Sequence, residues 1–98
     1  MYQEITPMGF GIAIERGKTL FKDKSEFQDV EIFESRAFGN VLTLDGLMMT
    51  TEKDEFFYHE MIAHIPLIAH KNPENILVIG GGDGGTVREV LKHKSVKS

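Results

Sequence analysis

The first half of the chain alternates hydrophobic and polar residues with a period of two, which predicts short β-strands. The alternation is clear in residues 10–15 and again in residues 27–35. Phe27 and Phe33 fall on the second face of the latter segment, so we expect that strand to be covered on both sides. We expect a turn at Gly17-Lys18, followed by a return strand.

The clearest hairpin lies in residues 40–50, where two short apolar runs flank Asp45-Gly46. An Asp-Gly pair readily adopts the positive φ angles of a two-residue hairpin turn. Another turn is expected at Gly39-Asn40. Together these segments predict an antiparallel, β-rich N-terminal domain over residues 1–51.

The hydrophobic period changes to that of a helix between about Glu52 and His70. Thr51, followed by an acid three residues later, resembles a capping box at the start of this helix. Four apolar residues share a stripe with helical spacing, which is typical of a face that packs on a core. They are Phe57, Met61, Ile65 and Ile68.

Residues 76–79, with the sequence ILVI, form a continuous apolar run before a glycine-rich loop. Such a run predicts a strand that is buried on both faces of a parallel sheet. Gly80, Gly82 and Gly85 match the G-x-G-x-x-G pattern, here placed between a strand and a helix as in nucleotide-binding loops. The following helix should turn three apolar residues inward. These are Val87, Val90 and Leu91.

The order of helix, strand, glycine loop and helix predicts an α/β domain that begins at residue 52. A parallel strand needs parallel neighbours, and no further strand pattern follows before Ser98. We therefore expect residues 52–98 to be the start of a truncated parallel-sheet domain, in the N-terminal portion of a longer protein. The alternative is that another copy of the chain supplies the missing contacts.

Asp83 lies at the tip of the glycine loop, where phosphate would otherwise be expected to bind. A carboxylate beside a phosphate is repelled by roughly 1–4 kcal/mol at contact distance, depending on the dielectric. One interpretation is that Asp83 only caps the following helix, since aspartate is a favoured N-cap residue. The other is that the ligand has no phosphate and carries positive charge, as a sulfonium nucleoside or an amine does. Asp83 can fill both roles at once.

Composition narrows the function classes. The 98 residues carry a formal charge of −4, with 11 basic and 15 acidic side chains, which argues against a nucleic-acid partner. No cysteine is present, which excludes disulfides, zinc thiolates and cysteine nucleophiles. We see no signal peptide, and the most apolar long stretch, residues 61–70, is too short for a bilayer. We therefore expect a cytoplasmic protein with no membrane partner.

The histidine-rich helix does not predict a metal site. His59 and His64 are five residues apart and diverge by roughly 140° around a helix, whereas a zinc protease helix needs histidines on one face. For His64 and His70 we expect a polar edge on a packed helix. His59 shares a face with Glu55 and Ala63, which makes it a candidate for lining a pocket.

Two long segments resemble a known family. Residues 44–67 (LDGLMMTTEKDEFFYHEMIAHIPL) and 72–93 (NPENILVIGGGDGGTVREVLKH) are similar to the spermidine synthases, the polyamine aminopropyltransferases. The Tyr-His pair at 58–59 resembles the bacterial branch. The resemblance implies a β-rich N-terminal domain followed by a Rossmann-like domain of the class I methyltransferase type. It also implies transfer of an aminopropyl group from decarboxylated S-adenosylmethionine, a co-substrate and not a cofactor, to putrescine, giving spermidine and 5′-methylthioadenosine.

The resemblance also implies roles for particular residues. By itself Gln28 would be a surface glutamine and Tyr58 a core residue, but in the family pattern both contact substrates. Asp83 would hold an amine of the substrates and would disfavour ordinary S-adenosylmethionine, whose extra carboxylate would meet it. The implied substrate-binding side chains are Gln28 for the nucleoside and Tyr58, His59 and Asp83 for the amine, and the nucleoside-binding loop is Gly80, Gly81 and Gly82.

The family places its acid for the ribose hydroxyls and the aspartate that deprotonates the amine after positions equivalent to Ser98. An ammonium with a pKa of about 10 is a poor nucleophile until a base takes its proton. We therefore expect no catalytic residue within these 98 residues and no transfer activity from this chain alone.

Two other functions stay open at the sequence level. A class I S-adenosylmethionine-dependent N-methyltransferase shares the strand and the glycine loop, and putrescine N-methyltransferases resemble spermidine synthases closely. The second alternative is a non-catalytic oligomerisation or binding module that is held together through its hairpins. Exposed strand edges and an apolar helix stripe favour self-association in either case, and oligomers are common in the family, so we expect a homodimer or homotetramer.

Overall fold

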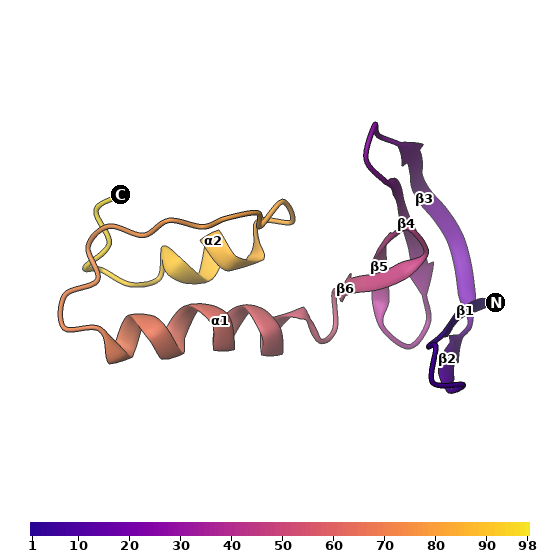
Figure 1. Cartoon of the computed structure of the whole chain (residues 1–98), viewed down its shortest axis with the longest axis horizontal. Coiled ribbons are helices and arrows are strands. Elements are labelled where there is room, and N and C mark those ends of the chain that lie inside the picture. Colours follow the sequence, from indigo (N-terminus) through magenta and orange to yellow (C-terminus); the bar gives the residue numbers. More distant parts are fainter. The chain divides into compact units, whose positions relative to one another are not determined.

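A computed structural model describes all 98 residues, which fall into two units, Met1–Asp54 and Glu55–Ser98. We refer to these as the N-terminal unit and the C-terminal unit. The N-terminal unit consists of β-strands, and the C-terminal unit consists of two helices and an extended segment (Figure 1).

The N-terminal unit contains two antiparallel sheets. A two-stranded sheet pairs β1 (Tyr2–Ile5) with β2 (Gly11–Ile14). A four-stranded sheet has the order β3-β4-β5-β6, so each strand pairs with its neighbour in sequence. Its strands are β3 (Arg16–Lys24), β4 (Asp29–Ser35), β5 (Gly39–Leu44) and β6 (Leu47–Thr51). The antiparallel β-rich character predicted for this region is confirmed.

The turn predicted at Gly17-Lys18 is wrong, because both residues lie inside β3. The register of β3 against β4 shifts between Arg16 and Thr19, so the glycine marks a bulge in a long strand. A Cβ at Gly17 would lie 3.1 Å from the carbonyl oxygen of Glu34, so glycine also permits close approach of the two backbones here. The partner of β2 is therefore β1, a strand that the alternation pattern did not reveal.

The turn at Asp45-Gly46 is confirmed. Asp45 and Gly46 have φ angles of 52° and 77°, and Leu44 pairs with Leu47 across the two-residue turn. The turn expected at Gly39-Asn40 is displaced, since residues 36–38 form the connection and β5 begins at Gly39.

The core of the N-terminal unit is formed by Tyr2, Phe33 and Val41, all buried. The rings of Tyr2 and Phe33 lie 5.4 Å apart, and the guanidinium of Arg16 lies 4.6 Å from the Phe33 ring centroid. Burial, followed by the hydrogen bond to Glu4, raises the pKa of Tyr2 to about 12. Phe27, expected to help cover β4, is 88 % exposed, because β4 begins only at Asp29 and Phe27 lies in the loop before it.

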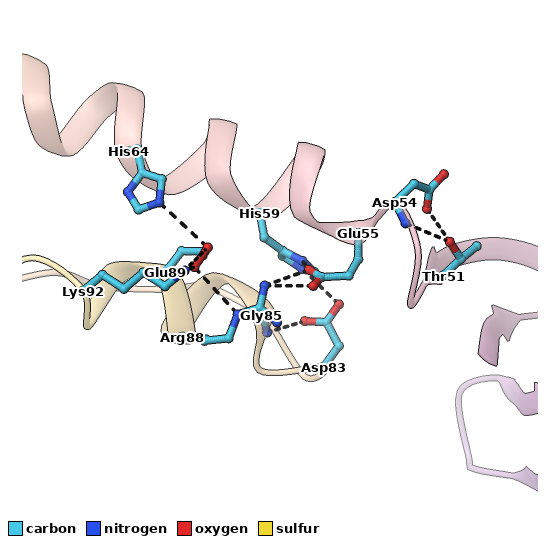
Figure 2. Close-up of polar contacts among 10 residues, drawn as sticks. All are labelled: Thr51, Asp54, Glu55, His59, His64, Asp83, Gly85, Arg88, Glu89 and Lys92. Carbon is cyan, nitrogen blue, oxygen red and sulfur yellow. Dashed lines mark hydrogen bonds and ion pairs between the residues drawn. The ribbon is translucent and has the colours of Figure 1, made fainter. Parts of the chain in front are cut away.

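The helix predicted over residues 52–70 is observed as α1 (Glu55–Ala69). The residues before it, 52–54, form a turn. The Asp54 amide donates to the Thr51 hydroxyl oxygen at 3.3 Å, and that hydroxyl donates to the Asp54 carboxylate (Figure 2). The contact between Thr51 and the acid three residues later therefore forms as expected, but it spans the turn that precedes α1.

The face of α1 that packs inward is not the apolar stripe. The buried residues of α1 are His59, Ala63 and Leu67, whereas Met61 and its neighbours on the stripe are exposed. The physical reason is that α1 packs on α2 (Gly85–Val90), and small residues at the contact let the two helices approach closely. The stripe residues exposed in this chain are Phe57, Met61, Ile65 and Ile68.

The helix after the glycine loop is less buried than predicted. Val90 joins Ala63 and Leu67 in the core of the C-terminal unit. Val87 and Leu91, expected on the inner side, are 42 % and 69 % exposed. Only one residue of the predicted inner face is therefore buried, because α2 turns a single narrow face toward α1.

Residues 76–78 have no regular secondary structure and Ile79 lies in a bend, so the predicted strand is not formed. Ile76 and Val78 pack on the core of the C-terminal unit, while Leu77 and Ile79 are 84 % and 90 % exposed. The segment thus buries one face where two were predicted. The Ile76 amide donates to the carbonyl oxygen of Ser98 at 2.8 Å, but a ladder needs a row of such bonds to a neighbouring strand, and residues 77–79 make none. Neither α1 nor α2 is long and apolar enough to cross a membrane.

Candidate functional site

The glycine loop leaves an open surface between the extended segment and α2. Gly80 and Gly84 have φ angles of 86° and 78°, which side chains rarely adopt. A Cβ added at Gly80, Gly82 or Gly84 would meet no atom within 4 Å, so the backbone here is accessible to a ligand. The predicted loop residue Gly81 differs, since a Cβ there would lie 2.9 Å from Val78.

Asp83 turns its carboxylate back toward the start of α2. Its Oδ1 accepts a hydrogen bond of 3.0 Å from the amide of Gly85, the first residue of the helix. The N-cap residue itself is Gly84, which has no side chain to cap the helix. Asp83 therefore satisfies one free helical N–H from the position before the N-cap, which corrects the simple cap interpretation.

The second oxygen of Asp83 contacts a buried histidine. Asp83 Oδ2 lies 3.1 Å from Nε2 of His59, and the other ring nitrogen, Nδ1, contacts the carboxylate of Glu55 (Figure 2). His59 is only 2 % exposed. The predicted pocket residue is thus buried between two acids, one from its own helix and one from the glycine loop.

Gly85 makes room for this histidine. A Cβ at Gly85 would collide with the imidazole ring of His59, which packs directly on the backbone of α2. The last glycine of the G-x-G-x-x-G pattern therefore serves close packing between a helix and a side chain, and the open positions of the loop precede it.

Arg88 completes the cluster from the first turn after the loop. Its guanidinium donates to Glu55 at 2.9 Å. This hydrogen bond, followed by the one from His59, lowers the pKa of Glu55. The hydrogen bond to Glu55 in turn raises the pKa of Arg88. Glu55 is therefore an ionised carboxylate held by one guanidinium and one imidazole.

Tyr58 and Gln28 lie in different units. The Tyr58 ring is 5.3 Å from the His59 ring in an edge-on arrangement, and Tyr58 is 60 % exposed, so it is not the core residue that its type alone would suggest. Gln28 belongs to the N-terminal unit, where it is half-buried immediately before β4. Of the predicted site residues, the C-terminal unit therefore brings together Tyr58, His59 and Asp83.

A second polar cluster lies further along α1 and α2. Glu89 is 1 % exposed, and Nζ of Lys92 lies within 2.7 Å of both its carboxylate oxygens. The hydrogen bond from Lys92 lowers the pKa of Glu89. His64 lies 3.9 Å from Glu89, and its Nδ1 is 2.7 Å from Nε2 of His93. The polar edge expected at His64 therefore has specific partners.

No group of three or more histidine or acidic side chains is arranged to hold a metal ion. His70 lies outside both clusters and accepts a hydrogen bond of 3.0 Å from the amide of Asn72. The sequence interpretation missed Glu55 and Arg88 as parts of the site. The available signal was the spacing of four residues between Glu55 and His59, which places both side chains on one face of a helix.

Both units of the chain match models of a known protein family. Residues 1–52 match the family described as the spermidine synthase tetramerisation domain, and residues 55–98 match the spermine/spermidine synthase domain. The chain belongs to the spermidine synthase family. The resemblance identified in the sequence is thereby confirmed.

Individual relatives of this spermidine synthase family chain are similar over nearly its whole length. It is 57 % identical over 96 residues to a polyamine aminopropyltransferase of Bacillus subtilis and 60 % identical over 89 residues to one of Leptospira biflexa. These alignments cover 98 % and 91 % of the chain but only 35 % and 32 % of the relatives. The chain therefore spans about one third of the length of the curated relatives that it matches.

Solved structures give the same result. The crystal structure of spermidine synthase from Thermotoga maritima superposes with a TM-score of 0.93 at 50 % identity, covering 97 % of this chain and 34 % of that one. A spermidine synthase in complex with the transition-state analogue AdoDATO also gives 0.93, at 51 % identity, covering 97 % and 33 %. The α/β fold of this part of the family is therefore shared by the chain.

Proposed function

We propose that this chain is the N-terminal portion of a spermidine synthase that transfers an aminopropyl group from decarboxylated S-adenosylmethionine to putrescine. The observation that carries the proposal is the acid of the glycine loop, Asp83, placed beside His59 in a chain whose relatives are named polyamine aminopropyltransferases. A carboxylate in an open glycine loop suits a cationic nucleoside or amine and disfavours a phosphate.

We assign the ligand-binding roles as follows. The open backbone at Gly80 and Gly82 leaves room for a nucleoside to pass over the loop. Asp83, with 26 % of its side chain exposed, has surface left to accept an ammonium. The proposed nucleoside contacts are Gln28, Gly80, Gly81 and Gly82, and the proposed amine contacts are Tyr58, His59 and Asp83.

In the proposed reaction, a neutral amine nitrogen of putrescine attacks the aminopropyl carbon attached to the sulfonium. The carbon–sulfur bond breaks, and its electron pair stays on sulfur, giving 5′-methylthioadenosine. The residues of this chain bind and orient the two cations, and the base that takes the proton from the amine lies outside them. The chain alone is therefore predicted to be inactive, and decarboxylated S-adenosylmethionine is consumed as a co-substrate.

We further propose that residues 1–51 form the assembly domain of a homodimer or homotetramer and that residues 52–98 begin a Rossmann-like catalytic domain. The match of residues 1–52 to a tetramerisation domain supports the assembly role. The exposed outer face of residues 76–79, at Leu77 and Ile79, suits a strand that enters a larger sheet. We propose a cytoplasmic location, because the absence of cysteine suits a reducing compartment.

The role of Asp83 is tested by the Asp83→Asn variant of the complete enzyme. The wild type should bind decarboxylated S-adenosylmethionine more tightly than S-adenosylmethionine, measured as the ratio of the two dissociation constants by titration calorimetry. Removing the repulsion between Asp83 and the extra carboxylate of S-adenosylmethionine, about 1.4 kcal/mol, should reduce that ratio about tenfold.

The matched control is Glu60→Gln, which removes the same charge from an exposed position on α1. It should leave the ratio unchanged. A wild type that prefers ordinary S-adenosylmethionine would contradict the proposal and favour the N-methyltransferase alternative.

A further inference from the structure

The hydrogen-bonding partners of His59 determine how many protons its ring carries. Nδ1 contacts the carboxylate of Glu55, and Nε2 lies 3.1 Å from a carboxylate oxygen of Asp83. An ionised carboxylate only accepts hydrogen bonds. Both ring nitrogens must therefore donate, which requires the imidazolium form of a histidine that is almost fully buried.

Both acids also accept hydrogen bonds from groups other than His59. Arg88 donates to Glu55 and lowers the pKa of that carboxyl, as does His59. Asp83 accepts from the Gly85 amide through the oxygen that does not face His59. Two carboxylates, one guanidinium and one imidazolium thus form a cluster whose charges sum to zero.

The other groups around His59 do not change this balance. On its own helix, the neighbouring Tyr58 ring lies edge-on to the His59 ring, with the two ring centroids 5.3 Å apart. On α2, Gly85 contributes backbone, and the next charged groups are Arg88 and Glu89, which lie 3.7 Å from each other. Glu89 is paired with Lys92, whose positive charge balances that of its carboxylate.

We propose that Glu55, anchored by Arg88, is a positioning residue that holds His59 as an imidazolium against Asp83, and that an amine cation binding at Asp83 displaces the Nε2 proton of His59. The inference rests on the proposed function in one respect, that the amine binds at Asp83.

The displacement follows from the charges. An ammonium beside Asp83 adds a second cation where one carboxylate faces one imidazolium, and like charges at a few ångströms disfavour the protonated histidine. Loss of the Nε2 proton to solvent restores the neutral cluster. Nδ1 keeps its proton for Glu55, and the lone pair left on Nε2 accepts a hydrogen bond from the ammonium, which also donates to Asp83. Before the amine binds, the imidazolium therefore makes the contact with Asp83 that the ammonium makes afterwards.

The first experiment measures the protonation state of His59 without ligand. Nitrogen-15 NMR spectra of the histidine rings at pH 7 should show both nitrogens of His59 protonated, with the signals assigned by their loss in His59→Gln. In Glu55→Gln the doubly protonated fraction should fall, whereas Glu55→Asp should retain part of it and Glu60→Gln all of it. A singly protonated His59 in the wild type would overturn the proposal, and so would an unchanged fraction in Glu55→Gln.

The second experiment measures proton release when putrescine binds to the complete enzyme. Calorimetric titrations at pH 7 in phosphate and in Tris, which differ in ionisation enthalpy, give the number of protons released. We expect the wild type and Glu60→Gln to release about one proton more than His59→Gln. Subtracting the number of protons released by His59→Gln removes the contribution of any proton that the amine itself loses to another base.

The outcomes separate the two proposals. Equal proton release by the wild type and His59→Gln, with putrescine bound in both, would overturn the role of His59 and leave the amine site intact. If putrescine gave no binding heat in either buffer at saturating concentration, the amine site and the proton linkage would both be contradicted.

Discussion

Replacing Gly85 with alanine should lower the free energy of unfolding of the chain by about 3 kcal/mol, the upper end for overpacking of a well-filled site. The new Cβ would collide with the ring of His59, which has no room to move because both of its nitrogens are held by carboxylates. The ring must leave its place, so the contact with Asp83 is lost as well. Urea denaturation followed by circular dichroism measures the change.

Gly82→Ala is the matched control for this substitution. A Cβ at Gly82 would meet no atom within 4 Å, and its φ angle is not positive. We expect a change within about 0.5 kcal/mol. Equal stability of the Gly85→Ala and Gly82→Ala variants would show that the His59 ring does not pack on α2 as described.

The second large effect is expected in the N-terminal unit. Phe33→Ala should lower the free energy of unfolding by about 3–5 kcal/mol, because a fully buried aromatic ring is replaced by a cavity. Phe33 is 0 % exposed and packs against Tyr2. The same denaturation experiment applies, with the loss of β-sheet signal as the readout.

Phe27 provides a control of identical chemistry, since it is 88 % exposed two residues before β4 begins. Phe27→Ala should change the free energy of unfolding by no more than about 0.5 kcal/mol. A loss for Phe27→Ala comparable to that for Phe33→Ala would contradict the core described here and restore the two-sided burial that the sequence pattern predicts.

Local signals in the sequence were sufficient for some features. The Asp45-Gly46 turn follows from backbone preferences that neighbouring residues hardly alter, and the structure contains it. The glycine loop before a helix is likewise a local property of residues 80–85. The sequence also indicated that Asp83 could both cap the helix and contact a cationic ligand, because a carboxylate in this loop conflicts with a phosphate.

Features that depend on partners distant in sequence were predicted less well. Gly17 is compatible with either a turn or a bulge, and only the pairing of β3 with β4 decides between them. The apolar stripe on α1 indicates a face to be covered but not which surface covers it. In this chain α2 packs on the opposite face, around His59 and Ala63, because Gly85 and alanine permit close contact there.

The positioning roles of Glu55 and Arg88 could not be predicted either, because they also depend on partners distant in sequence. Arg88 lies 33 residues from Glu55 in sequence, so only the packing of α2 on α1 brings them together. The spacing of Glu55 and His59 on one helix was readable, but it does not reveal that Asp83 faces the other ring nitrogen. The charge balance of the cluster therefore emerges only from the folded C-terminal unit.

The proposed aminopropyl transfer is tested most directly by identifying the products. The complete enzyme that carries this chain should convert putrescine and decarboxylated S-adenosylmethionine to spermidine and 5′-methylthioadenosine in equal amounts, as measured by chromatography and mass spectrometry. The 98-residue chain alone should form neither product above background. Formation of N-methylputrescine from ordinary S-adenosylmethionine, with no spermidine from the decarboxylated substrate, would contradict the account.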